Sequence, residues 1–315
     1  MPDTSTTLIA GAGGHVGGRL FQHMVATSTS TVRPAFRRTI DLPAWAQHVS
    51  PVIGDLGDSL VRETALKDAD TVVYLATRGY SSAQPASQGD LQEEHTTTLQ
   101  FAAEAARHGV QKFVFVSSIH VFGRALRGVV NDLTPPQPTT EYGLSRLAIE
   151  DDLLALGVQT SMQVVIVRMT NTFGCPLFNR SAIWDLFIHD LCKQVVQTGA
   201  ITLRTNGAQY RNMLALQDAV VSLAQIASNT TIINGRYILA SQHTLQLREL
   251  AEWVQHQAQV ALGTSPTVEV NEADMTVHHA FSLQSSGLAT IGIDIPDHRD
   301  DELRNLLLFA AREYS

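Results

Sequence analysis

The chain has 315 residues, of which 44% are hydrophobic and 17% are charged, and its formal net charge is −8. This composition is typical of a folded globular protein, and the length buries a core large enough for one large domain or two smaller lobes. The acidic balance argues against a nucleic-acid partner, because binding to a phosphate backbone needs a basic surface.

The first residues of the chain and its two cysteines bear on the cellular compartment of the protein. The first residues, "MPDTSTTLIAGAGG", lack the basic region and the apolar run of a signal peptide, and no later stretch approaches the roughly 18 apolar residues of a membrane helix. We therefore expect a cytoplasmic protein with no membrane partner. Cys175 and Cys192 form no metal-ligand pattern, so we expect two reduced core residues and no metal site.

Short apolar segments alternate with helical patterns over the first 171 residues. The pattern predicts strands at 6–11, 31–38, 51–56, 71–77, 112–118 and 163–171, and helices at 17–27, 59–69, 90–109 and 143–157. The strands are apolar almost throughout, as expected where helices cover both faces of a parallel sheet. The predicted fold is α/β, with a Rossmann-type doubly wound parallel sheet.

The alternation loosens after Gly174. Helices are predicted near 183–197, 217–228 and 245–262, with strands at 200–205 and 236–241. We interpret residues 1–173, joined by about 212–241, as a dinucleotide-binding domain. The remainder of 174–315 forms a smaller lobe that is interleaved with the end of the sheet.

A glycine-rich segment joins the first predicted strand to the first helix. Gly11, Gly14 and Gly17 have the spacing GxxGxxG, which lets a backbone turn tightly and approach a pyrophosphate at a helix N-terminus. We assign these glycines, with His15 and Val16 between them, to cofactor binding. The alternative is a glycine-rich turn that holds no ligand.

The residues at the end of the second predicted strand bear on the choice of cofactor. A carboxylate at its end would bind the adenosine ribose, whereas a cation would meet a 2′-phosphate. The chain has Arg37 and Arg38 there, which favours NADP slightly over NAD, unless both arginines are merely solvated. Pro34 is awkward within this strand, because proline removes a hydrogen bond of the ladder.

Two later strand ends supply further cofactor candidates. The pair Asp55 and Leu56 stands at the end of the third predicted strand, in "GDL", where it could meet the adenine ring. Ala76, in "LATR" at the end of the next strand, could lie under the cofactor. Ligands of open α/β sheets bind at the carboxyl ends of the strands, which is where these residues stand.

The stretch "EYGLSR" suggests acid–base chemistry. An unperturbed tyrosine, with a pKa of about 10, is too weak a base near neutral pH, and a fixed cation nearby favours its phenolate. Tyr142 and Arg146 are four residues apart and can share a helix face. Ser118, at the carboxyl end of the strand at 112–118, could bond the reacting oxygen. The alternative is an ordinary helix start, with Arg146 paired to Glu150.

Seven motifs stand in a recognisable order: "GAGGHVG", "GDL", "YLAT", "FVFVSSIHVFG", "YGLSR", "VRMTNTFG" and "YRNMLALQDA". With them the chain resembles, over nearly its whole length, an extended short-chain dehydrogenase/reductase of the nucleotide-sugar epimerase/dehydratase family. The resemblance implies that the smaller lobe binds substrate, that Ser118 polarises the reacting group and that Tyr142 is the acid/base. It also implies that the cation four residues after Tyr142 anchors the nicotinamide ribose. In this chain that residue is Arg146, where a lysine is expected.

Departures from the family pattern narrow the chemistry. Ile119 and His120 replace the Asp-Glu pair that the resemblance implies for 4,6-dehydratases, so we do not expect that dehydration. His120 is a candidate substrate contact, or else a packed histidine. Asn171 and Arg211 match positions that hold nucleotide phosphates, although a turn cap and a surface ion pair are the alternatives. Asp218 is expected to orient the following helix.

Two functions remain open. The first is an NAD(P)-dependent enzyme that reduces a 4-keto sugar nucleotide or epimerises it through a keto intermediate. The second is a catalytically weakened NAD(P)-binding sensor or partner protein of the same fold. The resemblance also implies a homodimer that pairs through the helices at 90–109 and 143–157, and the small apolar residues of "LQFAAEAARHG" suit close helix contact.

Overall fold

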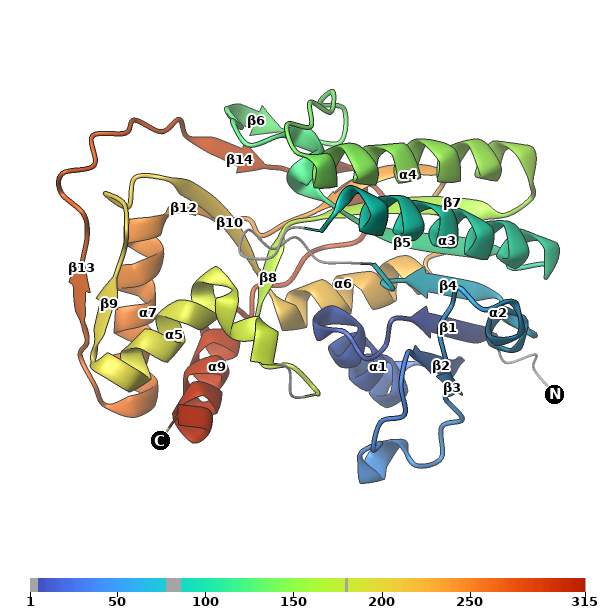
Figure 1. The fold of residues 1–315 in the computed structure, drawn as a ribbon, viewed down its shortest axis with the longest axis horizontal. Helices are drawn as coiled ribbons and strands as arrows, with labels where there is room; N and C mark the ends of the chain where they lie inside the picture. The colour runs from blue at the N-terminus through green and yellow to red at the C-terminus, as the bar shows by residue number, and fades with distance from the viewer. Residues whose placement is uncertain (1–4, 78–85, 179–180, 315) are drawn as a thin grey trace.

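The computed structural model describes residues 5–77, 86–178 and 181–314. Figure 1 shows two parts side by side. A twisted sheet with helices on both faces occupies one part, and a smaller group of helices and short strands, which includes the C-terminal helix, forms the other. The α/β class predicted from the sequence is confirmed by this architecture.

Among the described residues, seven strands form one parallel sheet in the order β11-β7-β5-β4-β1-β2-β3. They are β1 (Thr6–Ala10), β2 (Thr31–Phe36), β3 (Val52–Ile53), β4 (Thr71–Tyr74), β5 (Lys112–Ser118), β7 (Gln163–Met169) and β11 (Gly235–Leu239). From β1, the chain continues through β2 to β3 at one edge of the sheet. From β4, it continues through β5 and β7 to β11 at the other edge. The switch point between β1 and β4 is where such sheets bind ligands.

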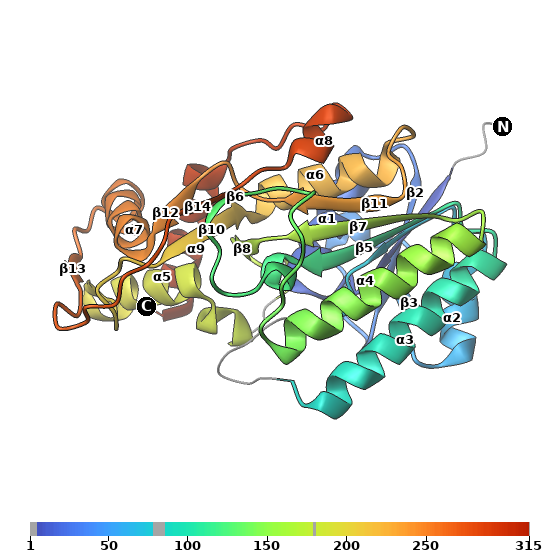
Figure 2. The same cartoon turned by 90° about the horizontal axis from the view of Figure 1, so that it is seen from above.

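Helices cover both faces of this sheet (Figure 2). Helices α1 (His15–Thr27) and α6 (Leu216–Ser228) pack on one face, and α2 (Ser59–Leu66), α3 (Gln88–Arg107) and α4 (Glu141–Gln159) pack on the other. Successive residues of β5 alternate between the two cores: Val114 faces α1 and α6, whereas Phe113 and Phe115 face α3 and α4. None of the helices described is both long enough and apolar enough to cross a membrane.

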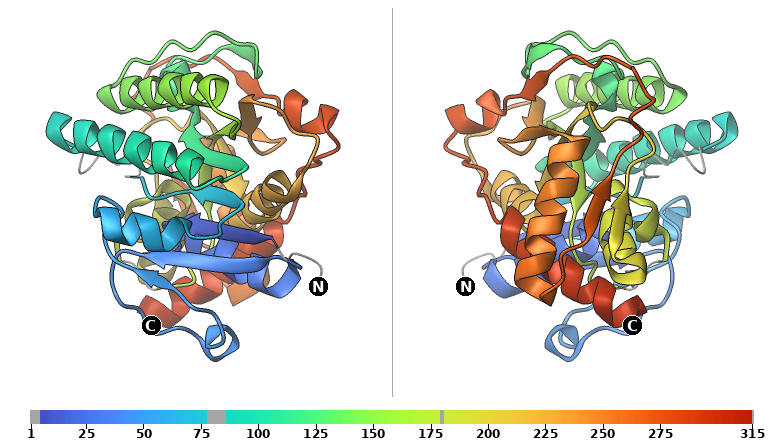
Figure 3. Two further views of the ribbon diagram at one scale, coloured as in Figure 1. Left: turned by 90° about the vertical axis from the view of Figure 1, so that its right-hand side faces the viewer. Right: turned by 90° about the vertical axis from the view of Figure 1, so that its left-hand side faces the viewer.

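The smaller part is built around a separate core between α5 (Phe187–Thr198), α7 (Leu247–Leu262) and α9 (Arg299–Tyr314), as the right-hand view of Figure 3 shows. Its strands are β8 (Asn171–Phe173), β10 (Tyr210–Ala215) and β12 (Thr244–Gln246), in the order β12-β10-β8, and the pair β9 (Ala200–Thr202) and β13 (Thr267–Glu269). The remaining elements are β6 (Gly128–Val130) paired with β14 (Phe281–Leu283), helix α8 (Ser286–Thr290), and the 3-10 helices η1 (Ala44–Ala46), η2 (Ile119–Phe122) and η3 (Ser181–Asp185).

Several of these elements differ from the sequence-based prediction. The strand predicted at 163–171 divides into β7 and β8, because Thr170 turns the chain: its N–H bonds Leu239 of β11 and its hydroxyl bonds Asn212 of β10. Strands β6, β10, β12, β13 and β14 and helix α9 were not predicted. Most of these strands have three residues, which is too short to display an alternation of two.

Pro34 lies inside β2 after all, opposite Ile9 of β1. Strand β3 pairs with β2 only at Ala35 and Phe36, so at Pro34 the sheet has a partner strand on one side only. A strand edge is where a missing N–H is tolerated. The second strand was therefore placed correctly, but it ends at Phe36, two residues before the predicted end, and Arg37 follows it directly.

A buried lysine attaches helix α6 to the sheet. Lys112 opens β5, and its ammonium group donates to the carbonyl oxygens of Ala227 at 3.1 Å, of Ile226 at 3.4 Å and of Asn229. These carbonyls lie at the C-terminus of α6, where they have no partner within the helix and the helix dipole favours a cation. Burial lowers the pKa of Lys112.

Replacing Lys112 with methionine is expected to lower the free energy of unfolding by about 1–3 kcal/mol, because buried carbonyl oxygens of α6 lose their donor. Urea unfolding followed by circular dichroism measures the change. Lys67→Met is the matched control, since Lys67 is exposed and should change the stability by less than about 0.5 kcal/mol. Equal effects of the two substitutions would contradict a capping role for Lys112.

Candidate active site

The glycine loop follows β1 and is shaped by close backbone contacts. Gly11 has a φ of +89°, and a Cβ there would lie 2.7 Å from the carbonyl carbon of Leu75. A Cβ at Gly17 would lie 2.2 Å from the carbonyl oxygen of Gly11, and the N–H of Gly14 donates to that same oxygen at 2.9 Å. Two of the three glycines therefore stand where a side chain would disrupt the turn.

The loop presents the N-terminus of α1 at the sheet's switch point. Gly14 is the N-cap, no side chain caps the helix, and its first turn contains no acidic residue. The backbone N–H groups of His15 and Val16 begin the helix, where the dipole favours an anion. Ala76 lies against the loop, since the backbone nitrogen of Ala76 is 2.8 Å from a Cβ built at Gly11. This cradle fits a dinucleotide pyrophosphate.

The ends of β2 and β3 lie together, but their charges are paired. The guanidinium of Arg37 lies 2.9 Å from the carboxylate of Asp55, and both side chains are largely exposed. Asp55 also accepts the backbone N–H of Gly57 at 2.8 Å. Arg38 is exposed beside them, and Leu56 is partly buried. Asp55 therefore offsets the positive charge that favoured a 2′-phosphate in the sequence analysis.

Ser118 and Tyr142 both contact η2. The hydroxyl of Ser118 accepts the N–H of His120 at 3.3 Å and caps η2. A Cβ at Gly143 would lie 2.6 Å from the carbonyl oxygen of His120, so the first turn of α4 packs directly on η2. The ring of Tyr142 consequently meets the ring of His120 edge to face, with the centroids 5.8 Å apart. Thr140 caps α4 through the N–H of Gly143 at 3.1 Å.

Arg146 lies one turn further along α4, as its spacing predicted, and it is almost fully buried, with 1% of its surface exposed. Its guanidinium carbon lies 4.8 Å from the centre of the Tyr142 ring, and its Nη2 forms an ion pair with Glu94 of α3. A cation over the face of a tyrosine ring is attracted by the ring quadrupole. The shared helix face predicted for Tyr142 and Arg146 is therefore confirmed, as a contact between the guanidinium and the face of the ring.

The alternative pairing of Arg146 with Glu150 is wrong. Glu150 is fully buried and binds Arg168 of β7 at 2.7 Å and Arg236 of β11 at 3.1 Å, and it accepts the hydroxyl of Ser117 at 2.6 Å. The sheet thus supplies donors to Glu150, while α3 supplies the carboxylate for Arg146.

Glu94 was missed by the sequence analysis, although a signal was present. The buried residues of α3 follow helical spacing: Leu91, Glu94, Thr98, Phe101, Ala102 and Ala105. A carboxylate within an apolar stripe must find a buried partner, because an unpaired buried charge is very costly. Tyr74, at the end of β4, lies close to the same pair, and burial raises its pKa to about 12.

The candidate substrate residues gather on the side of the smaller lobe. Asn171 in β8 is opposite Met213 in β10, and Arg211 precedes Met213 by two residues, so Asn171 and Arg211 belong to one face of their sheet. Both are exposed. Burial lowers the pKa of His120, and the positive charges of Arg211 and Arg124 lower it further. His120 is therefore neutral near pH 7, with Arg124 as an additional cation nearby.

Asp218 and the two cysteines lie outside the site. Asp218, at the start of α6, accepts the backbone N–H of His298 at 3.1 Å and contacts its ring nitrogen Nδ1 at 2.6 Å, which joins α6 to the start of α9. Cys175 and Cys192 are free thiols, and burial raises the pKa of Cys175 to about 12, so this thiol is unreactive at neutral pH. No cluster of potential metal ligands occurs within the described part of the chain.

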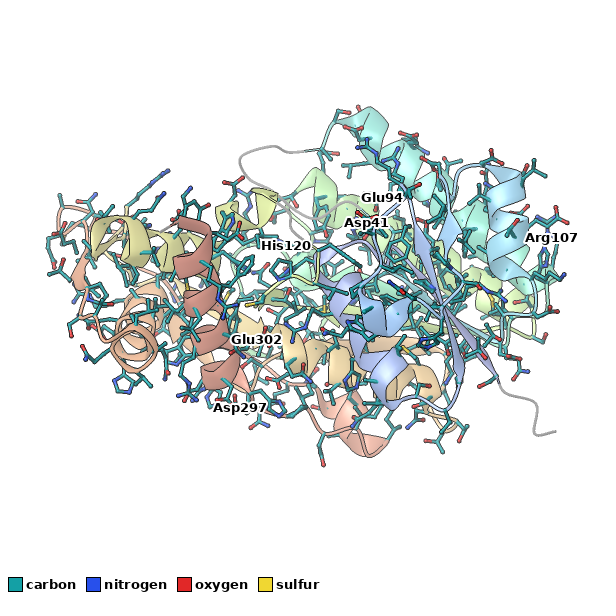
Figure 4. All side chains as sticks on the ribbon, turned by 90° about the horizontal axis from the view of Figure 1, so that it is seen from below. Asp41, Glu94, Arg107, His120, Asp297 and Glu302 are labelled. Carbon is teal, nitrogen blue, oxygen red and sulfur yellow. The ribbon has the colours of Figure 1, made fainter. Side chains whose placement is uncertain are left out.

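A charged contact joins the cofactor helix to the smaller part. Arg19 of α1 donates to Glu302 of α9 at 2.9 Å, to the carbonyl oxygen of Cys175 at 2.9 Å and to Gln217 of α6 at 3.1 Å. Glu302, labelled on α9 in Figure 4, is 3% exposed and also accepts the N–H of Cys175 at 3.1 Å. The glycine loop and the smaller part are therefore held in a fixed relation.

The fold, with a tyrosine and a cation on one helix and a serine at the neighbouring strand end, is that of the short-chain dehydrogenase/reductase class. The model of the NAD dependent epimerase/dehydratase family matches residues 7–239. The chain belongs to this family, whose enzymes are extended short-chain dehydrogenases/reductases.

Individual relatives match only part of the chain. The UDP-glucose 4-epimerase of Vibrio cholerae is 31% identical over 175 residues, which cover 53% of this chain and 52% of that protein. The 2'-dehydrokanamycin reductase of Streptomyces kanamyceticus is 30% identical over 232 residues, which cover 64% of each chain. The matched segments thus span about half to two thirds of these relatives.

The fold is shared over the full length of a solved structure. MoeE5, in complex with UDP-glucose and NAD, superposes with a TM-score of 0.79 at 21% identity, over 99% of this chain and all of that one. The slight preference for NADP expected from Arg37 and Arg38 is not supported, because the family is NAD-dependent and Arg37 is paired with Asp55.

Replacing Gly17 with alanine is expected to weaken NADH binding by about tenfold or more, which is about 1.4 kcal/mol, because the new Cβ would displace the Gly11 carbonyl from the turn. Fluorescence titration of the purified variant measures the dissociation constant. Gly89→Ala is the control, since a Cβ there meets nothing closer than the Ser87 hydroxyl at 3.8 Å. Unchanged affinity in Gly17→Ala would refute the pyrophosphate cradle.

Proposed function

We propose that this enzyme uses NAD to oxidise or reduce a carbinol carbon of a nucleotide-linked sugar, either as a 4-ketoreductase or as an epimerase that passes through a transient keto intermediate. The observation that carries the proposal is the contact of Arg146 with the ring of Tyr142, beside the Ser118-capped η2 at the carboxyl end of β5. When bound, the nicotinamide supplies or accepts the hydride; the protein must manage the proton of the sugar hydroxyl.

The proposed roles follow from the positions of the side chains. Tyr142 exchanges the proton of the reacting hydroxyl, and Arg146 favours its phenolate form. Ser118 hydrogen-bonds the reacting oxygen through its hydroxyl, which also accepts the N–H of His120. The neutral ring of His120, edge-on to Tyr142, orients the sugar without adding a charge to the site.

The substrate is proposed from the cationic side of the site and from the comparisons. Asn171 and Arg211 belong to one sheet face and offer amide and guanidinium donors for a diphosphate. A UDP-sugar epimerase is among the sequence relatives, and the similar fold of MoeE5 is described with UDP-glucose. Dehydration at positions 4 and 6 is not proposed, because Ile119 and His120 supply no acid pair.

The alternative of a weakened NAD-binding sensor is not favoured. The relatives are named as epimerases, dehydratases and reductases. Ser118 and Tyr142 are both retained at the hydride site, and a protein that only binds a dinucleotide has little physical need for them. The departure at Arg146 keeps the positive charge next to Tyr142.

We also propose that two copies of the chain pair through α3 and α4, which lie next to each other on one face of the sheet (Figure 2). Leu144, Ala148 and Ala155 are exposed on α4 and are spaced so that they share a stripe. Ala148→Glu places a charge in this stripe and is expected to give a monomer in sedimentation equilibrium. A wild-type chain that is monomeric at micromolar concentration would refute the pairing.

The function is tested by native mass spectrometry, followed by titration with NADH and NADPH under UDP-, dTDP- and GDP-linked sugars and 4-keto sugars. Cofactor that stays bound through purification, with no net oxidation when a sugar is added, indicates an epimerase. Exchangeable NADH that is consumed by a keto sugar indicates a reductase. Dinucleotide binding without chemistry on any sugar would refute the proposal.

Tyr142→Phe is expected to lower kcat by about a hundredfold or more while the dissociation constant for NADH changes less than about threefold, because the substitution removes only the proton-transfer group. Steady-state kinetics and fluorescence titration separate the two effects. Tyr237→Phe is the control: its hydroxyl bonds the carbonyl of Ile233 away from the site, and its activity should stay within about twofold of wild type. A Tyr142→Phe variant as active as wild type would eliminate this mechanism.

A further inference from the structure

Glu94 occupies an unusual position for a carboxylate. Glu94 is labelled in Figure 4 and belongs to the buried stripe of α3. The residue is 8% exposed. Its ion-pair partner, Arg146, is 1% exposed and belongs to α4. A buried pair of this kind is strongly destabilised when one partner is removed, because the remaining charge is left uncompensated in a low dielectric.

The burial of Arg146 limits what its guanidinium can touch. A group that binds a cofactor or substrate must present surface to the site into which the ligand enters, and 1% exposure leaves almost none. The guanidinium is instead shared between Glu94 and the face of the Tyr142 ring. The role that the family resemblance implied for this position, anchoring the nicotinamide ribose, does not fit such a placement.

We propose that Glu94 is a positioning residue that holds the guanidinium of Arg146 against Tyr142 and away from the cofactor. Arg146 then acts on Tyr142 through its charge alone, and the nicotinamide ribose is bound without it. This inference rests on the proposed role of Tyr142 as the acid/base.

Among the described residues, charged and titratable groups from several elements lie around Tyr142. Arg146 on its own helix contacts its ring, and Glu94 of α3 holds Arg146. His120 of η2 contacts the ring from another direction and is kept neutral by burial and by the charges of Arg211 and Arg124. Tyr74 of β4 lies near Glu94 and Arg146, and with a pKa raised to about 12 it stays protonated. Glu94 is the carboxylate that pairs with Arg146, so its removal changes the charge balance around Tyr142.

Glu94→Gln keeps the size of the side chain and removes its charge. The positive charge of Arg146 is then uncompensated and favours the phenolate of Tyr142. The transition in the pH profile of kcat that is caused by ionisation of Tyr142 is therefore expected to move to lower pH by about one unit. Glu104→Gln is the matched control on the same helix, because it removes the carboxylate that pairs with the largely buried Arg62. The control should lose comparable stability and keep the pH profile of wild type.

The ionisation of Tyr142 can also be followed without turnover. In protein labelled with ¹³C at the tyrosine ring, the Tyr142 signal is assigned by its absence in Tyr142→Phe, and its midpoint is expected to fall in Glu94→Gln and to stay in place in Glu104→Gln. This measurement separates the two hypotheses: an enzyme that turns over no sugar refutes the proposed function, whereas an unchanged midpoint in Glu94→Gln overturns the role of Glu94.

A double variant tests the statement about the cofactor and remains informative if Glu94→Gln does not fold. Glu94→Gln combined with Arg146→Met removes both charges and leaves no unpaired ion. Its dissociation constant for NADH is expected to stay within about threefold of wild type. The midpoint of its Tyr142 titration should lie above the midpoint in Glu94→Gln. If Glu94→Gln is unfolded, the comparison is with wild type, and the midpoint should lie above the wild-type value. Weakening of NADH binding by thirtyfold or more would show that Arg146 does anchor the cofactor, and would overturn the inference.

Discussion

The position of helix α4 depends on one buried carboxylate. Glu150 is fully buried and receives Arg168, Arg236 and the hydroxyl of Ser117 from three strands of the sheet. Removing a carboxylate from water costs several kcal/mol unless donors replace the water, so the helix is fixed in the rotation that brings Glu150 to them. Because residues four apart share a helix face, the same rotation turns Tyr142 and Arg146 inward.

The cofactor cradle and the acid/base residues meet because of the sheet topology. Gly11 and Ala76 follow β1 and β4, and Ser118 ends β5. These three strands are neighbours in the sheet, and the carboxyl ends of parallel strands all lie at one edge. The first turn of α4 then packs on η2, which extends β5, and places Tyr142 at that edge. Arg19 and Glu302 tie the opposite side of the cradle to the smaller part of the molecule.

Much of the fold and the core of the site were predictable because they are encoded locally. The glycine spacing, the apolar strands and the spacing of Tyr142 to Arg146 each involve neighbouring residues. The partner of Arg146 was not predictable in the same way: Glu150 stands at the favourable spacing, but the sheet offers it two guanidinium groups, and Arg146 pairs instead across helices. Arg37 was similarly misjudged, because its neutralising partner Asp55 comes from another strand end.

An arginine paired with a carboxylate stands where a lysine was expected, and this pairing shortens the distance over which the positive charge acts. The electrostatic potential of an unpaired cation falls slowly with distance, so the cation affects charged groups well beyond its contacts. The potential of a close ion pair falls more steeply with distance, because the two opposite charges largely cancel. With Glu94 beside it, Arg146 therefore influences the ring it touches at 4.8 Å and little beyond it. In the proposed mechanism, such an arrangement separates two tasks that one lysine would combine: the pair between α3 and α4 holds the positive charge against Tyr142, and the retention of the cofactor is left to the glycine loop and the strand ends.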